Sequence, residues 1–360
     1  MQQNQQKVYI IVPIMVVIII FAAYFFEWDI ATRLNKDSTA SNIEELSAMI
    51  DTQISEGKKR GSFFVSNVTM DDISKINDYV VNVNGKVDNF LMTEKSRKGY
   101  RVTVNYDISD NYYVYQKYVN GKEIPSDRPA AYKLYAKVDE ILSSIITPNM
   151  TDYEKEQAIH DYIVTNCEYG YTDYSKEYAY CAYGALVQNK AVCEGYAQAI
   201  SLLLNCVGVE NTLIVGEASG EPHAWNQVKI DNKWYQLDAT WNDPVPDKKG
   251  FASHMYFNVT DDILDDTHTW NSEQFNVCNN MDYNYFVYND LIYSYDDLDD
   301  CINDFASSNI TATIEVIVSD FNEHNFNLNE IVFNNDLVQY FSYFNQPYGE
   351  NEIVTIFLNQ

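Results

Sequence analysis

The distribution of apolar and polar positions divides the chain into segments of different periodicity. An uninterrupted apolar run, VYIIVPIMVVIIIFAAYFF, covers residues 8–26. It is long enough to cross a bilayer core of about 30 Å at roughly 1.5 Å per residue. A cleaved signal peptide is the alternative, but its apolar region normally spans about 7 to 15 residues before a small-residue cleavage site. The pattern therefore predicts a cytoplasmic tail and a transmembrane helix within residues 1–30.

The segments that flank the centre of the chain mix helical and strand periodicities. Apolar residues recur at helical spacing in residues 43–50, which predicts a stalk helix and linker within 31–60. Alternating residues in 61–125 predict a small α+β domain, in which the second pair of strands turns at Asn120 and Gly121. A helix followed by strands in 276–360 predicts a C-terminal α+β module that ends on the strand NEIVTIFLN.

The central segment, residues 126–275, contains longer elements. A helix is expected over 151–167, with Thr151 as its N-cap and Glu154 completing a capping box. A second, more apolar helix is expected within 189–210 and carries Cys193 near its start. Three strands follow, and the last two are joined by a two-residue turn at Asp231 and Asn232. The fold class that these patterns predict is α+β.

Charge limits the partners that such a chain can have. Lys and Arg number 24 against 52 Asp and Glu, which gives a formal net charge of −28. No segment gathers the basic residues that follow a phosphate backbone, so we expect no nucleic-acid partner. Lys7 directly precedes the apolar run, whereas Arg33 and Lys36 follow it at a greater distance. This asymmetry favours a cytoplasmic N-terminus, a single pass through the cell membrane, and an extracellular bulk of the chain.

The six cysteines show neither a CxxC metal pair nor a compact disulfide pattern. We therefore expect no metal and no cofactor. A disulfide between Cys278 and Cys301 is left open by the sequence. Two histidines, His160 and His268, are expected to be structural or to support the site from behind.

The predicted hairpin brings a histidine and an aspartate together. With Asp231 and Asn232 in the turn, His223 opposes Thr240 and Asp238 opposes Trp225, so His223 and Asp238 are diagonal neighbours on one face of the sheet. Diagonal positions lie about 7 to 8 Å apart at the backbone, within reach of an imidazole and a carboxylate. Asp238 can then orient the ring of His223, as the third member of a catalytic triad does.

Cys193 is the candidate nucleophile. A helix N-terminus offers free N–H groups and partial positive charge, both of which favour a thiolate. The backbone N–H of Cys193 and one further donor, for which Gln188 is a candidate, could receive an oxyanion. From these residues alone, Cys193 can also be a structural residue without a catalytic role, because a single cysteine in an apolar helix is commonly packed in the core.

Three blocks of the sequence then resemble a known family. The blocks are AYGALVQNKAVCEGYAQAISLLLNCVGVE, EPHAWNQVKIDNKWYQLDATWNDP and YFNVTDDILDDTHTW, which together resemble the bacterial transglutaminase-like superfamily over roughly residues 150–270. The resemblance implies a papain-like core in which a central helix bearing the cysteine packs on an antiparallel sheet bearing the histidine and the aspartate. It also implies that Cys193 is the nucleophile, His223 the general base and later acid, and Asp238 the residue that orients His223.

The function that follows is a membrane-anchored surface enzyme that cleaves or transfers amide bonds of proteins or peptides, including cell-wall-associated ones, through an acyl-thioester. Whether water or an amine takes the acyl group stays open. The alternative hypothesis is a catalytically silent surface binding or scaffold protein that uses the same fold.

Overall fold

The computed structural model describes residues 38–56, 58, 60–69, 72, 91–96, 99–105, 108–171, 178–245, 248, 250–308, 312–322, 326–328, 332 and 338–359. The transmembrane helix predicted over residues 8–26 lies outside these ranges. Within them, no helix has the length and apolar character that a membrane span requires. The chain divides into two compact units, one formed by residues 1–81 and 86–109 and the other by 82–85 and 110–360.

In the described part of the first unit, a helix packs against a four-stranded sheet of the strand order β1-β2-β4-β3. Its elements are β1 (Ser38–Ala40), α2 (Ile43–Ser55), β2 (Arg60–Val65), β3 (Leu91–Ser96) and β4 (Gly99–Asn105). Helix α2 begins after the N-cap Asn42, whose side chain accepts the N–H of Glu45. Its residues Leu46 and Ile50 are fully buried, like Phe63 of β2. The helix that we expected as a stalk is therefore part of a folded module.

The prediction of a hairpin that turns at Asn120 and Gly121 is wrong, because residues 110–120 form a helix, α4 (Asp110–Asn120). The aromatic and β-branched residues of DNYYVYQKYVN favour a strand by local propensity. Tertiary packing prevails, since Val114 is fully buried in the core of the second unit. Gly121 then ends the helix in the left-handed region at φ 66°, and its N–H returns to the carbonyl of Lys117.

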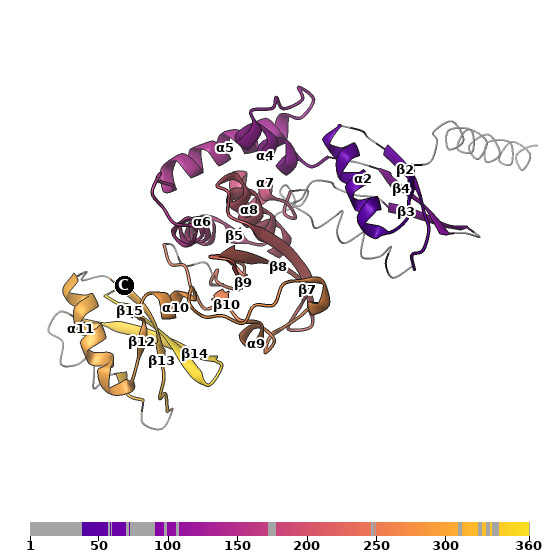
Figure 1. Cartoon of the computed structure of the whole chain (residues 1–360). Helices are drawn as coiled ribbons and strands as arrows, with labels where there is room; N and C mark the ends of the chain where they lie inside the picture. The colour runs from indigo at the N-terminus through magenta and orange to yellow at the C-terminus, as the bar shows by residue number, and fades with distance from the viewer. Residues whose placement is uncertain are drawn as a thin grey trace, which may run out of the picture. The chain divides into compact units, whose positions relative to one another are not determined.

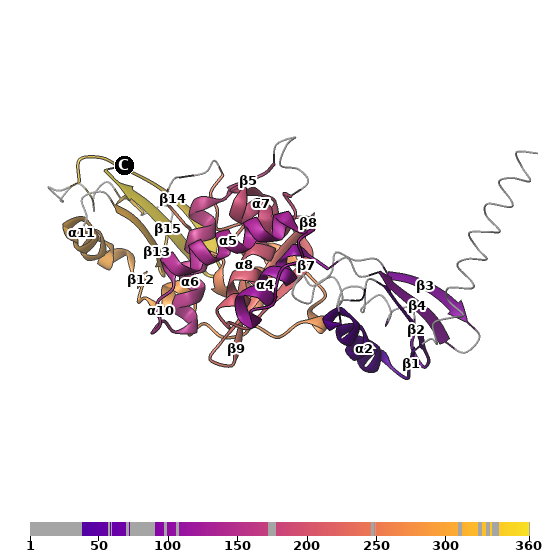
Figure 2. The same ribbon diagram turned by 90° about the horizontal axis from the view of Figure 1, so that it is seen from above.

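The second unit places helices on one face of an antiparallel five-stranded sheet, and this mixed arrangement confirms the predicted α+β class (Figures 1 and 2). The helices are α4, α5 (Pro129–Ile145), α6 (Asp152–Asn166), α7 (Ala182–Val187) and α8 (Cys193–Cys206). The sheet has the order β10-β9-β8-β7-β11, formed by β7 (Asn211–Ala218), β8 (Glu221–Ile230), β9 (Lys233–Leu237), β10 (Phe257–Val259) and β11 (His268–Thr269). The capping box of Thr151 and Glu154 at the start of α6 is confirmed.

The hairpin of β8 and β9 has the predicted turn. Asp231 and Asn232 both adopt left-handed backbone conformations, with φ 49° and 62°, and Ile230 pairs with Lys233. The returning strand of this hairpin, β9, ends at Leu237. It stops there because the next side chain, Asp238, accepts two backbone N–H groups of the following turn.

The C-terminal part of the second unit is a further α/β layer. Its mixed sheet has the order β12-β13-β15-β14 and is covered by α11 (Leu298–Ser308). The strands are β12 (Ile292–Tyr293), β13 (Ala312–Val318), β14 (Phe341–Tyr348) and β15 (Asn351–Leu358). The predicted final strand is thereby confirmed.

The second unit also contains short elements, namely β5 (Glu168–Tyr169), β6 (Lys190–Ala191), α9 (Asp261–Leu264), η1 (Ser272–Gln274), α10 (Tyr285–Tyr288) and η2 (Tyr295–Asp297). A separate apolar cluster joins the five-stranded sheet to the C-terminal layer, with Ile214 and Trp225 on one side and Ile317 and Ile353 on the other. All six cysteines are free, so Cys278 and Cys301 are not paired in this structure.

Gly216 of β7 allows the edge strand β11 to approach the sheet. A Cβ at this position would lie 2.3 Å from the carbonyl oxygen of Thr269 and 2.8 Å from the ring of Trp225. Gly216 also pairs directly with His223. A clash with a backbone oxygen cannot be relieved by rotating a side chain, so an alanine here must displace β11.

We expect Gly216→Ala to lower the free energy of unfolding by roughly 1 to 3 kcal/mol, the usual cost of overpacking. Urea denaturation measures this, with Val215→Ala, an exposed neighbour on the same strand, as the matched control. Equal urea midpoints for Gly216→Ala and the unaltered protein would show that β11 does not pack as described.

Candidate active site

Cys193 is the first residue of helix α8. The preceding residue, Val192, is the N-cap and provides no side-chain cap, so the first turn of the helix directs its backbone N–H groups outward. Gly195 lets the loop before α7 lie against this turn, because a Cβ there would be 2.5 Å from the carbonyl oxygen of Ala179. The Cys193 side chain is half-buried at a helix end that carries partial positive charge.

His223 lies on β8 and links the cysteine to the aspartate. Its Nε2 is 2.7 Å from Oδ2 of Asp238. The side chain of Cys193 is close enough to the same imidazole to contribute to raising its pKa, and since Nε2 is taken by Asp238, Nδ1 is the nitrogen left for the sulfur. The ring is nearly buried and stacks on Trp225 with a centroid separation of 5.9 Å. The sequence-derived neighbours His223 and Asp238 are therefore in contact.

Asp238 is fully buried and is bound by four donors. Its Oδ1 accepts the backbone N–H groups of Thr240 and Trp241, at 2.9 and 3.1 Å. Its Oδ2 lies next to two histidines, His223 at 2.7 Å and His268 at 3.0 Å. A buried carboxylate is tolerated only when its lone pairs are satisfied in this way.

The electrostatics favour a charged histidine. Burial alone would lower the pKa of His223, but the charge and hydrogen bond of Asp238, helped by Cys193, raise it to about 10. Burial would raise the pKa of Asp238, yet the two histidines hold it well below its usual range. The buried pair is thus an imidazolium and a carboxylate at neutral pH.

Of the residues suggested by the sequence, Cys193, His223 and Asp238 are brought together by the fold. The amide oxygen of Gln188 is buried and has no hydrogen-bond partner within the described ranges, and its role as a second oxyanion donor stays a prediction. His268 was expected to be structural or to support the site, and its contact with Asp238 agrees with the second of these roles, although the sequence did not identify Asp238 as its partner. The sequence signal was its place in the third block, YFNVTDDILDDTHTW, after the hairpin.

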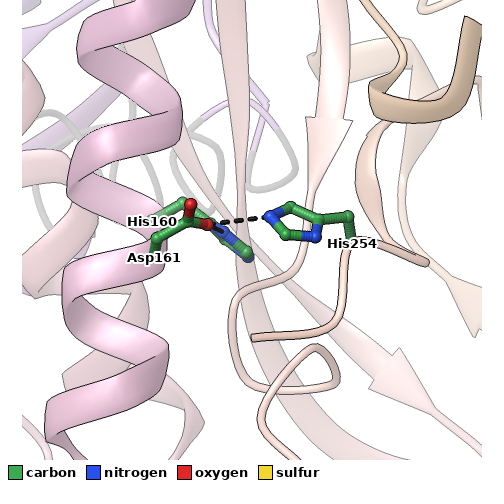
Figure 3. A group of neighbouring side chains, drawn as sticks. All are labelled: His160, Asp161 and His254. Carbon is green, nitrogen blue, oxygen red and sulfur yellow. Dashed lines mark hydrogen bonds and ion pairs between the residues drawn. The ribbon is translucent and has the colours of Figure 1, made fainter. Parts of the chain in front are cut away.

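A second cluster of titratable groups lies at His160, Asp161 and His254 (Figure 3). His160 Nδ1 and His254 Nε2 both lie 2.8 Å from Oδ1 of Asp161. His254 also contacts Glu315 of β13, with Nδ1 3.2 Å from Oε2. His254 therefore bridges a carboxylate of α6 and a carboxylate of the C-terminal layer.

Two histidines and a carboxylate are a common set of metal ligands, but the hydrogen bonds fit a protonated network better. The Asn242 amide oxygen accepts the N–H of Tyr256, so its Nδ2 group must donate to His160 Nε2, 3.0 Å away. His160 Nδ1 then carries the proton and donates to Asp161. A protonated Nδ1 has no lone pair for a metal.

The pKa directions agree with this assignment. Burial lowers the pKa of His160, so this ring is neutral. Burial would also lower the pKa of His254, but Asp161 and Glu315 raise it to about 9. His254 is thus a buried cation between two carboxylates, and it clamps the C-terminal layer to α6.

Comparison with known proteins finds a family model that matches the part of the chain containing this site. Residues 139–239, which include Cys193, His223 and Asp238, match the family model of the transglutaminase-like superfamily. The resemblance inferred from the three sequence blocks is thereby confirmed over this part of the chain.

More distant likenesses extend beyond that segment. Kyphoscoliosis peptidase of Homo sapiens is 26% identical over 145 residues, which cover 35% of this chain and 22% of that protein. The Mus musculus protein of the same name is equally similar. The chain thus spans less than a quarter of the curated relatives that it matches.

A solved structure described as a TGase covers 57% of this chain and 59% of its own, at 16% identity and a TM-score of 0.27. The periplasmic domain of TgpA from Pseudomonas aeruginosa, bound to ethylmercury, covers 42% of this chain and 65% of its own, at 13% identity and a TM-score of 0.23. Likenesses this remote support no statement about activity.

The clamp at His254 predicts a pH-dependent stability. The pKa of His254 is about 9 in the folded protein and about 6.5 in the unfolded chain. The stabilisation of the fold by protonated His254 is therefore fully present below pH ~6.5 and is lost as the pH rises through about 9. We expect the difference in unfolding free energy between the unaltered protein and His254→Gln to shrink by about 3 kcal/mol between pH 6 and pH 10. Urea titrations at each pH measure it.

Because His223 titrates in the same alkaline range, the difference between the two proteins is the quantity to follow. A difference that stays constant from pH 6 to pH 10 would show that His254 is not a buried cation.

Proposed function

We propose that this chain is a cysteine enzyme of transglutaminase-like type that acts on amide bonds of proteins or peptides through an acyl-thioester on Cys193. The observation that carries the proposal is the continuous contact from Cys193 through His223 to Asp238. Each member has the setting that its role needs: a helix N-terminus for the thiolate, a sheet for the imidazole, and a buried four-donor pocket for the carboxylate.

The charges of this arrangement suit a nucleophilic thiolate. A protonated His223 beside the sulfur stabilises a thiolate by direct ion pairing, and the start of α8 adds partial positive charge. The net charge of −28 acts in the opposite direction. Exposed charges are screened beyond about 8 Å at physiological ionic strength, whereas His223 acts in contact, so the local effect prevails.

The reaction proceeds in two halves. The thiolate of Cys193 attacks the amide carbonyl carbon, the C–S bond forms, and the C–N bond breaks as His223 gives its Nδ1 proton to the leaving amine. Backbone N–H groups at the start of α8 receive the oxyanion. In the second half, water or an amine attacks the thioester, His223 takes the proton from this nucleophile, and Cys193 leaves as a thiolate.

A polypeptide substrate fits the surroundings of the sulfur. Tyr169 and Tyr180 are 44% and 47% exposed, and Tyr169 is close enough to Cys193 for the sulfur's charge to contribute, after burial, to raising the pKa of that phenol. Exposed aromatic rings beside a nucleophile offer apolar contact area to an extended chain. Trp225, by contrast, is buried, and its indole N–H donates to Gln236, so it supports the sheet.

The proposed location is the outer face of the cell membrane, with the apolar run at residues 8–26 as the anchor. Its support is the sequence alone. A catalytically silent scaffold is the alternative, and it is disfavoured because packing does not require a buried charged pair aimed at a half-buried thiol.

The activated thiol is tested by the pH dependence of iodoacetamide labelling, read by peptide mapping. We expect the labelling rate of Cys193 to have its midpoint well below pH ~8.5, the value of an ordinary thiol, and we expect His223→Gln to move the midpoint up to about that value. Cys181 is the internal control, since its sulfur is also half-buried and donates to the carbonyl of Tyr178. A Cys193 midpoint near pH 8.5 that His223→Gln leaves unchanged would refute the nucleophile.

The choice between water and an amine needs a second assay. A glutamine-containing peptide is incubated with and without a labelled primary amine, and Cys193→Ser is the blank. Free acid as the only product in both reactions assigns hydrolysis, whereas incorporation of the label assigns transamidation.

A further inference from the structure

We propose that His268 is a positioning residue for this site, which holds the Asp238 carboxylate in the orientation that aligns His223 with Cys193. The inference rests on the proposed function, because it concerns the same three residues. It adds a fourth side chain that does not touch the reacting atoms and acts through Asp238.

The first observation is that two imidazoles share one carboxylate oxygen. His223 Nε2 and His268 Nε2 lie 2.7 and 3.0 Å from Oδ2 of Asp238. Two backbone N–H groups of the turn after β9 already hold Oδ1 in place. The position of the second oxygen, Oδ2, therefore depends on the two histidines. The two donors to Oδ2 come from β8 and β11, the strands on either side of β7, and together they fix the plane of the carboxylate.

The second observation concerns the proton on His268. An ionised carboxylate only accepts, so His268 Nε2 must carry a hydrogen. On the other side of the ring, Nδ1 lies 2.8 Å from the hydroxyl of Thr267, which is close enough to the phenol of Tyr256 to influence its pKa. This chain of polar groups extends the network from Tyr256 to Cys193 through side chains alone.

The third observation is that the ring cannot turn away. His268 is fully buried, and aromatic rings surround it: Trp241 at 4.6 Å, Trp225 at 5.1 Å and Tyr256 at 5.8 Å between centroids. Its backbone is tied to the sheet by the pairing of His268 with Ala218. Packing of this kind would accept any flat side chain, so the nitrogen directed at Asp238 is the specific feature.

Loss of that donor has a defined consequence. Without His268, one lone pair of a fully buried carboxylate is unpaired, and Asp238 can rotate to seek another partner. The ring of His223 would follow the carboxylate and lose its alignment with the sulfur. In metal sites, where outer hydrogen-bond partners orient the ligating side chains in a comparable way, removal of such a partner costs about 10- to 100-fold in metal affinity or activity.

The test compares two substitutions in the full chain. His268→Leu keeps apolar volume and removes the donor, whereas Gln in His268→Gln can place an N–H group near the position of Nε2. The readout is the rate and pH midpoint of iodoacetamide labelling at Cys193, with thermal unfolding as the check on folding. The titratable groups that face the sulfur and this network are His223, Asp238, Tyr169 and Tyr256.

For His268→Leu we expect labelling at pH 7 to slow by about 10-fold or more and the midpoint to move to higher pH, because a misaligned His223 stabilises the thiolate less. For His268→Gln we expect a rate within about 3-fold of the unaltered protein. A His268→Leu protein with an unaltered rate and midpoint overturns the inference. So does a His268→Gln protein as impaired as His268→Leu, which would indicate a role in packing alone.

If His268→Leu does not unfold cooperatively, the same labelling measurement on Thr267→Val tests the inference instead. It keeps the ring and removes the hydroxyl beside Nδ1, so we expect a smaller shift in the same direction, and an unchanged midpoint overturns the inference. Failure of the proposed function looks different, because the unaltered protein would then itself label with a midpoint near pH ~8.5.

Discussion

The burial of the Asp238 carboxylate is the constraint on which the site depends. A charge removed from water is stable only with a complete set of partners. Here the partners come from three places in the chain: the turn after β9, His223 on β8, and His268 on β11. The hairpin, the edge strand and the turn must all be in place for the carboxylate to be satisfied. The arrangement that orients His223 is therefore also one that the folded sheet requires.

The sequence predicts local parts of this arrangement well. The Asp231–Asn232 turn sets the register of β8 and β9, which brings the end of β9 near His223, and the turn after Leu237 completes the contact between Asp238 and His223. The capping box at Thr151 is similarly local. A supporting role for His268 was expected, but its partner was not, because His268 is 30 residues from Asp238 along the chain and no short-range pattern indicates that β11 pairs with β7.

Propensity and pattern failed where tertiary packing decides. The tyrosines of residues 110–120 favour a strand locally, yet this segment is helical because Val114 enters the core formed with the other helices. The apolar face of α2 matches both a stalk and a helix packed on a sheet, and only β2 and β4 show which of the two forms. The second titratable cluster shows the same limit, since Asp161 and Glu315 meet His254 from positions 93 and 61 residues away.

The C-terminal layer is joined to the rest of the second unit by two different interactions. An apolar cluster packs Trp225, which stacks on His223, with residues of the C-terminal strands. The buried cation His254 adds a polar tie between α6 and β13. Trp225 of β8 therefore contacts both His223 and the apolar cluster that contains the C-terminal strands.

The central claim is that Cys193 forms an acyl-thioester with the help of His223. The most direct measurement is peptide mapping by mass spectrometry after brief exposure of the full chain to 4-nitrophenyl acetate, an activated ester. The account predicts a hydroxylamine-labile acetyl group on Cys193 that forms much faster than any on Cys181 and is nearly lost in His223→Gln. Acetylation of Cys193 at the rate of Cys181, unaffected by His223→Gln, would contradict it.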